Sequence, residues 1–147
     1  MSFIPKILVI AGSDSGGGAG IQADIKTITY FKAYAMTAVT AITAQNTLGV
    51  QSIYPLPKET VIDQIQSVLN DLSPDVIKIG MLADIEIINY ISKNISNFKI
   101  VLDPVMVATS GDVLVDENVI SSIKNTLIEK SFLITPNIYE AEILTDI

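Results

Sequence analysis

At 147 residues, the chain is long enough for one domain and too short for two. Its net charge of −7 and pI near 4.3 argue against nucleic acid as a partner, and the absence of cysteine and histidine excludes disulfides, thiolate nucleophiles and the commonest general base. Hydrophobic residues make up 49% of the chain, yet no apolar run reaches the about 20 residues of a membrane span. We therefore expect a cytoplasmic protein that buries its strands on both faces, or a piece of a larger one.

Strand and helix patterns alternate from the N-terminus onward. A continuous apolar run over residues 6–11, bounded by glycine, is typical of a strand buried on both faces. Apolar side chains at helical spacing predict a helix over 19–31, and a stretch rich in Thr, Val and Ala predicts a second strand over 34–44. Residues 45–57 carry glycine and proline and indicate a loop, with a short strand at 50–54.

The rest of the chain continues this alternation, beginning with a helix whose apolar residues Val61, Ile65, Val68 and Leu72 share one face. The expected elements, in chain order, are a helix over 60–72, a strand over 76–79, a helix over 84–95, a strand over 99–102, a helix over 116–128, a strand over 132–135 and a helix from 137 onward.

This order of elements indicates an α/β fold with a mostly parallel sheet and helices on both faces. No internal repeat, low-complexity segment or linker interrupts the pattern, so we expect one domain over residues 1–147. The chain stops about two turns into its last predicted helix. We therefore expect a domain truncated at its C-terminus, whose last strand exposes an apolar edge.

Polar or special residues follow the end of every predicted parallel strand. In open parallel sheets, ligands bind at the carboxyl ends of the strands. One such tip would be ordinary turn chemistry, but five in order indicate a site. The tips are Gly12-Ser13-Asp14, Gln45-Asn46, Gly80-Met81, Asp103-Pro104 and Thr135-Pro136-Asn137.

The first tip, residues 12–20, holds five of the eight glycines of the chain. Glycine lets a ligand approach the backbone closely, and the helix N-terminus that follows offers free N–H groups. The segment is neither a P-loop nor a G-x-G-x-x-G turn, because the required Lys and the required glycine spacing are missing. The alternative is a plain tight turn in which Ser or Asp caps the helix.

Several polar and charged residues can each be interpreted in two ways. Asp24 lies in the first turns of its helix, where the dipole also favours an exposed acid. Lys78, between two isoleucines of a strand, either faces a polar site or extends to water at a sheet edge. Asp103 could organise Mg²⁺ or cap a turn. Asn137 and Glu140 have the spacing of a capping box, so a structural role is at least as well supported as metal binding.

In these segments the sequence resembles the hydroxymethylpyrimidine/phosphomethylpyrimidine kinases of thiamine biosynthesis, which belong to the ribokinase-like superfamily. The resemblance covers the whole chain, in order and at matching separations, and the combination of motifs is highly specific. Its segments are residues 11–24 (AGSDSGGGAGIQAD), 43–47 (TAQNT) with Gly49-Val50, 78–82 (KIGML), 102–106 (LDPVM), Ser110-Gly111-Asp112, and Thr135-Pro136-Asn137 with Glu140.

The resemblance implies a C-terminally truncated, three-layer α/β/α domain of a kinase that uses ATP and Mg²⁺. That kinase phosphorylates 4-amino-5-hydroxymethyl-2-methylpyrimidine and then its monophosphate. The residues implied to surround the pyrimidine are Gln45, Gly12, Ala19, Asp24, Met81 and Val107, with Gln45 on the ring edge. The nucleotide and phosphate region takes Asp103, Asn137 and Glu140, of which Asp103 and Glu140 meet Mg²⁺ mostly through water. By this comparison, the turn at 12–20 is a wall for the pyrimidine rather than a phosphate cradle.

The same resemblance implies that no catalytic residue lies in this chain, because the turn that stabilises the transferring phosphoryl group belongs to a later segment of the family. We therefore expect weak ATP binding and little kinase activity from these residues alone. The complete enzymes of the family suggest a homodimer. Three alternatives stay open: a non-catalytic remnant or pyrimidine-binding module, a pyridoxal kinase-like vitamin kinase, and an unrelated flavodoxin-like nucleotide-binding domain.

Overall fold

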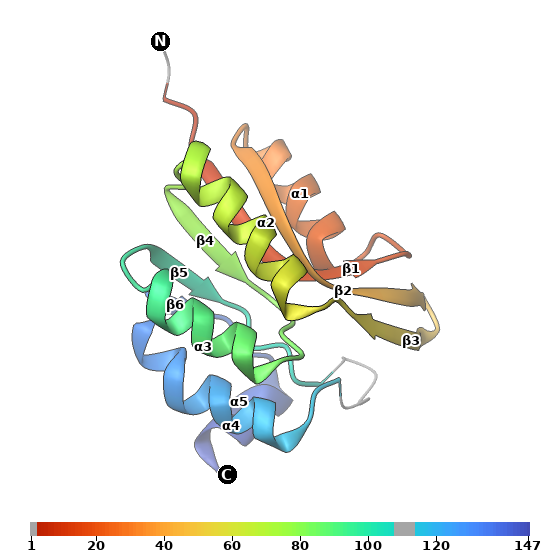
Figure 1. Cartoon of the computed structure of the whole chain (residues 1–147). Coiled ribbons are helices and arrows are strands. Elements are labelled where there is room, and N and C mark those ends of the chain that lie inside the picture. Colours follow the sequence, from red (N-terminus) through yellow and green to blue (C-terminus); the bar gives the residue numbers. More distant parts are fainter. Residues whose placement is uncertain (1–2, 108–113) are drawn as a thin grey trace.

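A six-stranded sheet forms the centre of the protein, and the computed structural model describes residues 3–107 and 114–147 of it (Figure 1). The strands lie in the order β3-β2-β1-β4-β5-β6. Their bounds are β1 Lys6–Asp14, β2 Tyr34–Asn46, β3 Gly49–Pro55, β4 Val76–Ile79, β5 Lys99–Leu102 and β6 Leu133–Ile134. The order places β1 and β4 in the interior of the sheet, where helices cover both of their faces.

The sheet is parallel except for one hairpin. β1 pairs in parallel with β2 and β4, and β5 pairs in parallel with β4 and β6. β3 is the exception, because Gly49–Pro55 runs back along β2 as an antiparallel partner. The sequence predicted only a short strand at 50–54 inside a loop. The longer observed strand arises because the edge of β2 opposite β1 has no other partner among the described strands over residues 41–46, and this edge satisfies the backbone groups of β3.

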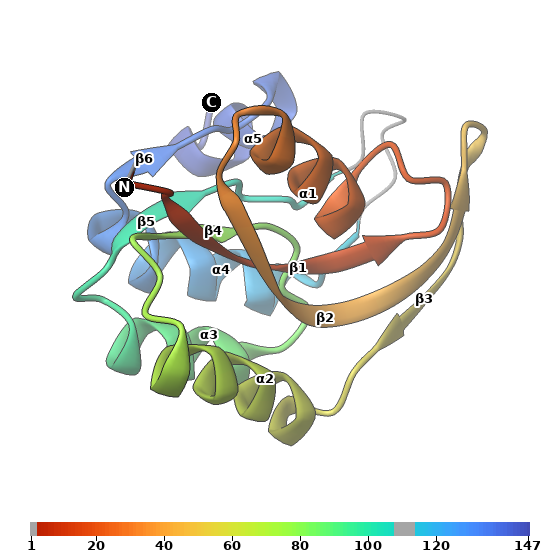
Figure 2. The same ribbon diagram turned by 90° about the horizontal axis from the view of Figure 1, so that it is seen from above.

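The helices cover both faces of the sheet, as the alternation of elements predicts. Figure 2 shows α1 on one side of the sheet and α2, α3 and α4 on the other. The bounds are α1 Gly20–Tyr30, α2 Lys58–Asp71, α3 Ile85–Asn94, α4 Glu117–Thr126 and α5 Ile138–Thr145. None of the helices in the described ranges is long and apolar enough to cross a bilayer.

Two apolar cores lie on the two faces of the sheet. Leu8 and Ile10 of β1 point into the larger core, which α2, α3 and α4 complete. Val9 of β1 points the other way, into a smaller core with Ile21 and Ile28 of α1. Leu8, Val9 and Ile10 have no exposed surface, so the first strand is buried on both faces as predicted.

Several predicted boundaries differ from the observed ones: the strand expected over 34–44 continues to Asn46, and the helix expected over 60–72 begins at Lys58. The sequence placed the end of the first strand at Ala11, before Gly12, but β1 continues to Asp14 after a register shift between Ala11 and Ser13. A glycine interrupts the regular ladder there without ending it, because the strand resumes its pairing with β2 at Ser13. The helix expected over 116–128 ends at Thr126, and a short 3₁₀ turn, Ile128–Lys130, follows it.

Candidate functional site

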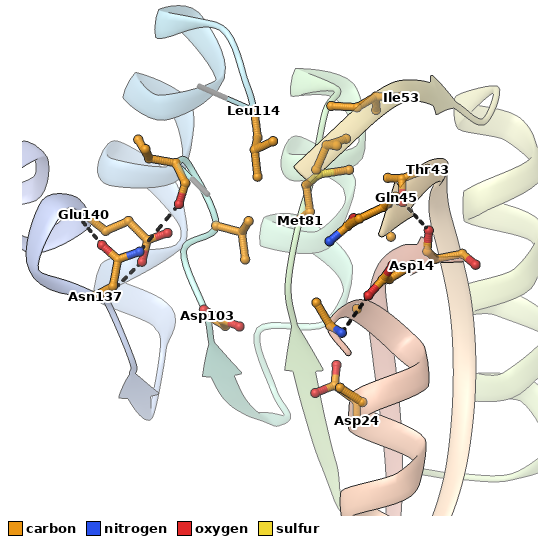
Figure 3. A pocket seen from close by; sticks show the side chains of 18 of the residues that line it. Asp14, Asp24, Thr43, Gln45, Ile53, Met81, Asp103, Leu114, Asn137 and Glu140 are labelled. Atoms are coloured by element: carbon orange, nitrogen blue, oxygen red, sulfur yellow. Dashed lines mark hydrogen bonds between the residues drawn. The ribbon is translucent and has the colours of Figure 1, made fainter. Parts of the chain in front are cut away.

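A cleft of about 370 Å³ opens where the carboxyl ends of β1, β2, β4, β5 and β6 meet (Figure 3). The five strand tips that the sequence singled out all contribute to it. Every residue predicted for the pyrimidine, phosphate or metal region lines the cleft: Gly12, Ala19, Asp24, Gln45, Met81, Asp103, Val107, Asn137 and Glu140. Ser110 and Asp112, which carry part of the family resemblance, lie outside the described residues.

The glycine-rich turn takes its shape from the carboxylate of Asp14, whose side chain is almost fully buried. Its Oδ1 accepts a hydrogen bond from the backbone N–H of Gly16 at 2.7 Å. Its Oδ2 accepts two more, from Gly18 at 2.9 Å and Ala19 at 2.8 Å. These three backbone N–H groups could otherwise donate to a phosphate, but they already donate to the carboxylate of Asp14. Residues of this turn line the cleft.

Gly20 brings the start of α1 against the end of β1. Its φ is +56°, and a Cβ added there would lie 2.4 Å from the carbonyl oxygen of Gly12. Only glycine tolerates both conditions. The side chain of Gln22 completes the contact, because its Oε1 accepts from the N–H of Asp14 at 2.8 Å and its Nε2 donates to the hydroxyl of Ser13 at 2.7 Å.

Hydrogen bonds hold both the side chain and the backbone of Gln45 at the end of β2. The hydroxyl of Thr43 lies 3.0 Å from the Oε1 of Gln45 and 2.9 Å from the carbonyl oxygen of Ser13. The hydroxyl of Ser15 accepts from the backbone N–H of Gln45 at 2.8 Å and lies 2.7 Å from its carbonyl oxygen. Figure 3 shows the amide of Gln45 directed into the cleft toward Met81.

Apolar groups form the walls between the two polar ends of the cleft. Met81 is the buried one among them, and the hydroxyl of Thr40 donates to its carbonyl oxygen at 2.7 Å, which fixes the chain after β4. Further apolar lining comes from β3, from the chain after β5 and from the chain before α4: Val50, Ile53, Val105, Val107 and Leu114. A slot of this kind suits a flat, weakly polar ring.

Two acidic side chains of the cleft share one lysine. Asp24 of α1 and Asp103 after β5 both contact the ammonium of Lys78, at 2.9 Å and 3.2 Å. The sequence left open whether Lys78 faces a site or a sheet edge, and whether Asp24 is an exposed acid. β4 is an interior strand and the side chain of Asp24 is 22% exposed, so both residues belong to the cleft.

Asn137 and Glu140 form a complete capping box at the start of α5. The side chain of Asn137 accepts from the N–H of Glu140 at 2.9 Å, and the Oε2 of Glu140 accepts from the N–H of Asn137 at 2.8 Å. The Oε1 of Glu140 also accepts from the N–H of Met106 at 3.2 Å, and the residue is 3% exposed. Glu140 therefore has a structural role, as the spacing of the two residues predicted.

The cleft contains residues that sequence reasoning did not assign. Thr43 could have been found, because strand periodicity places it on the same face as Gln45. Asp14 belongs to the glycine-rich segment, but nothing in the sequence indicated that its carboxylate would accept hydrogen bonds from three backbone N–H groups. Val105 was included only as part of the segment 102–106, and Leu114 carried no signal, since an apolar residue in a loop is equally compatible with the core.

Comparisons with known proteins identify the family of this chain. A family model described as phosphomethylpyrimidine kinase matches residues 14–147. The hydroxymethylpyrimidine/phosphomethylpyrimidine kinase of Bacillus subtilis (strain 168) is 48% identical over 145 residues, which cover 97% of this chain and 54% of that protein. The enzyme of the same name from Escherichia coli (strain K12) is 44% identical over 142 residues, covering 95% and 53%.

Solved structures give the same result for the fold. The phosphomethylpyrimidine kinase from Clostridium difficile 630 superimposes with a TM-score of 0.88 at 43% identity, covering 99% of this chain and 64% of that one. The pyridoxal kinase from Staphylococcus aureus in complex with pyridoxal has a TM-score of 0.87 at 35% identity, covering 99% and 53%. The chain spans about half the length of the curated relatives it matches. It has the ribokinase-like fold of these enzymes, and it belongs to the phosphomethylpyrimidine kinase family.

Proposed function

We propose that this chain is one partial domain that forms the pyrimidine-binding part of an ATP-dependent hydroxymethylpyrimidine/phosphomethylpyrimidine kinase. The observation that carries the proposal is the amide of Gln45, held by Thr43 at the mouth of an apolar slot. The cleft volume of about 370 Å³ is near the lower end of the range for small-molecule sites, which is about 300–1,000 Å³. A single substituted ring fits this space.

The chemistry of an aminopyrimidine matches that of the slot. A carboxamide offers a donor and an acceptor side by side, and a ring nitrogen next to an exocyclic amine offers the complementary pair. The ring faces need apolar contacts, which Met81, Val107, Ala19 and Gly12 would supply. Asp24 would border the ring from α1.

The opposite end of the cleft would take the phosphates and Mg²⁺. Mg²⁺ keeps several waters and usually binds one or two carboxylates plus substrate phosphates. Asp103 and Glu140 fit this requirement, although no three His, Cys, Asp or Glu side chains gather into a cage among residues 3–107 and 114–147. Glu140 would act through water, because both of its oxygens already accept backbone N–H bonds. When bound, Mg²⁺ would neutralise charge on the phosphates.

The 147 residues by themselves would support little phosphoryl transfer. The transition state spreads negative charge over the phosphoryl oxygens and needs cations or N–H donors around it. Lys78 is the only basic side chain among the described residues of the cleft, and two carboxylates already contact it. The amides of the glycine-rich turn are bound to Asp14. We expect no substrate-dependent ATP turnover above background in a coupled assay.

Isothermal titration calorimetry with hydroxymethylpyrimidine tests the pyrimidine site directly. Gln45→Ala should weaken binding by about 1–3 kcal/mol, because it leaves a polar ring edge unpaired. Gln51→Ala is the matched control, since Gln51 lies on the exposed side of β3 and bonds only Asn46 and Gly49 among described residues. Equal affinity of wild type and Gln45→Ala would remove Gln45 from the site.

Pyridoxal serves as the competing ligand in the same titration. The identity to the pyridoxal kinase is 35%, against 43–48% for several relatives named for hydroxymethylpyrimidine or its phosphate, so we expect the aminopyrimidine to bind more tightly. Tighter binding of pyridoxal would favour the vitamin kinase alternative. Absence of binding to either compound would overturn the proposed substrate-binding role.

A further inference from the structure

Lys78 occupies an unusual place for a lysine, on an interior strand of the sheet. Its neighbours Ile77 and Ile79 are fully buried in the larger core. Successive side chains of a strand point to opposite faces, so Lys78 faces the side of α1. The ammonium cannot reach bulk water along a sheet edge, because β1 and β5 flank β4. Lys78 therefore needs partners inside the cleft.

Those partners are two carboxylates from different elements. The Nζ of Lys78 lies 2.9 Å from the Oδ2 of Asp24 on α1 and 3.2 Å from the Oδ2 of Asp103 after β5. The side chains of Lys78, Asp24 and Asp103 are 20%, 22% and 34% exposed. Partial shielding from water makes these contacts stronger than those of a surface ion pair.

Gly80 leaves the space that this ammonium fills. A Cβ added to Gly80 would lie 3.2 Å from the Nζ of Lys78 and 3.0 Å from the Cβ of Ala11. A side chain at this position would therefore crowd the ammonium of Lys78. Gly80 thus leaves room for the ion pairs of Lys78 with Asp24 and Asp103, in addition to ending the strand.

The balance of charges in the cleft indicates a role for the two ion pairs of Lys78 with Asp24 and Asp103. Asp14, Asp24, Asp103 and Glu140 bring four carboxylates to the described part of the cleft, and Lys78 brings its only ammonium. We propose that Lys78 is a positioning residue, the resident counter-ion that ties Asp24 at the ring end to Asp103 at the phosphate end. The proposal rests on the proposed function only in the naming of these two ends. A divalent cation that reaches Asp103 must then compete with the ammonium.

Titration with Mn²⁺, followed by electron paramagnetic resonance of the free ion, tests this competition without any pyrimidine or nucleotide. Mn²⁺ suits a carboxylate site. Lys78→Met removes the ammonium and should raise the Mn²⁺ affinity roughly tenfold or more, because a positive charge a few ångströms from the ion is lost. Lys78→Arg keeps the charge and should stay near wild type. Lys93→Met removes an exposed lysine of α3 and controls for net charge.

The gain should also depend on Asp103, so Asp103→Asn in the Lys78→Met background should return the Mn²⁺ affinity to the wild-type level or below. Circular dichroism establishes that each variant is folded, and Lys78→Gln replaces Lys78→Met if the latter unfolds. Equal Mn²⁺ affinity of wild type and the neutral variant would overturn the proposal, and so would a gain that survives Asp103→Asn. Neither result depends on pyrimidine binding, so failure here is distinct from failure of the proposed function.

Discussion

The close contact between the start of α1 and the end of β1 leads to a sharp prediction for two glycines of the same turn. At Gly20 the backbone has φ +56°, and a Cβ would meet the carbonyl oxygen of Gly12 at 2.4 Å. At Gly18 the φ is not positive, and the nearest atom to an added Cβ is the Oδ2 of Asp14 at 3.9 Å. Gly20→Ala should therefore be strongly destabilising, and Gly18→Ala should not.

The magnitude follows from two costs. A left-handed backbone costs an L-residue roughly 1–2 kcal/mol, and forcing extra volume into a packed site costs about 1–3 kcal/mol. The loss of unfolded-state freedom on replacing glycine returns about 0.4–1 kcal/mol. The net for Gly20→Ala is a loss of about 1–5 kcal/mol in the free energy of unfolding, with a middle value of about 3 kcal/mol. Gly18→Ala keeps only the last term, so it should be neutral or slightly stabilising.

Urea denaturation followed by circular dichroism measures both variants. With a slope of about 1–3 kcal/mol per M for a small protein, a loss of about 3 kcal/mol in Gly20→Ala should lower the midpoint by about 1–3 M. The midpoint of Gly18→Ala should stay at or slightly above that of the wild type. Coinciding midpoints for the two variants would refute the reasoning, because the contact at Gly20 would then cost nothing to disturb.

Three further predictions concern other polar contacts. Asp14→Ala should lower the free energy of unfolding by about 2–3 kcal/mol, because three backbone N–H groups lose their acceptor. Asp14→Asn should lower it by less, because one side-chain oxygen remains. Equal losses for the two variants in urea denaturation would contradict this. Glu140→Ala should speed hydrogen exchange of the α5 amides roughly tenfold or more, and the exchange of the β1 amides should not change. Unchanged exchange in α5 would show that the capping box is dispensable. The hydrogen bond from Lys58 to Glu86 raises the pKa of Lys58 above its ordinary value of 10.5, so the small stabilisation from this pair is complete below that pH and is lost as the pH rises through the folded pKa. The difference in thermal unfolding temperature between Lys58→Met and wild type should then be constant from about pH 6 to 9, and a change within that window would argue against the pair.

The sequence by itself determined the order of elements and the edge of the sheet that carries the site. Strand segments such as 6–11 and 76–79 are short, end at glycine and alternate with amphipathic helices, and these local properties are typical of a parallel α/β sheet. The carboxyl ends of parallel strands share one edge, so the polar tips at Gln45, Asp103 and Asn137 could be assigned to one cleft before any coordinates.

Only the tertiary structure decided what the individual polar groups contact. Lys78 and Asp24 are 54 residues apart, and Glu140 meets the N–H of Met106 at a separation of 34. Such contacts depend on strand register and on the direction in which side chains leave each element, and neither is encoded in local spacing. For the same reason, the glycine-rich turn could be recognised from its composition, whereas its occupation by the carboxylate of Asp14 became evident only once β1 and α1 were packed together.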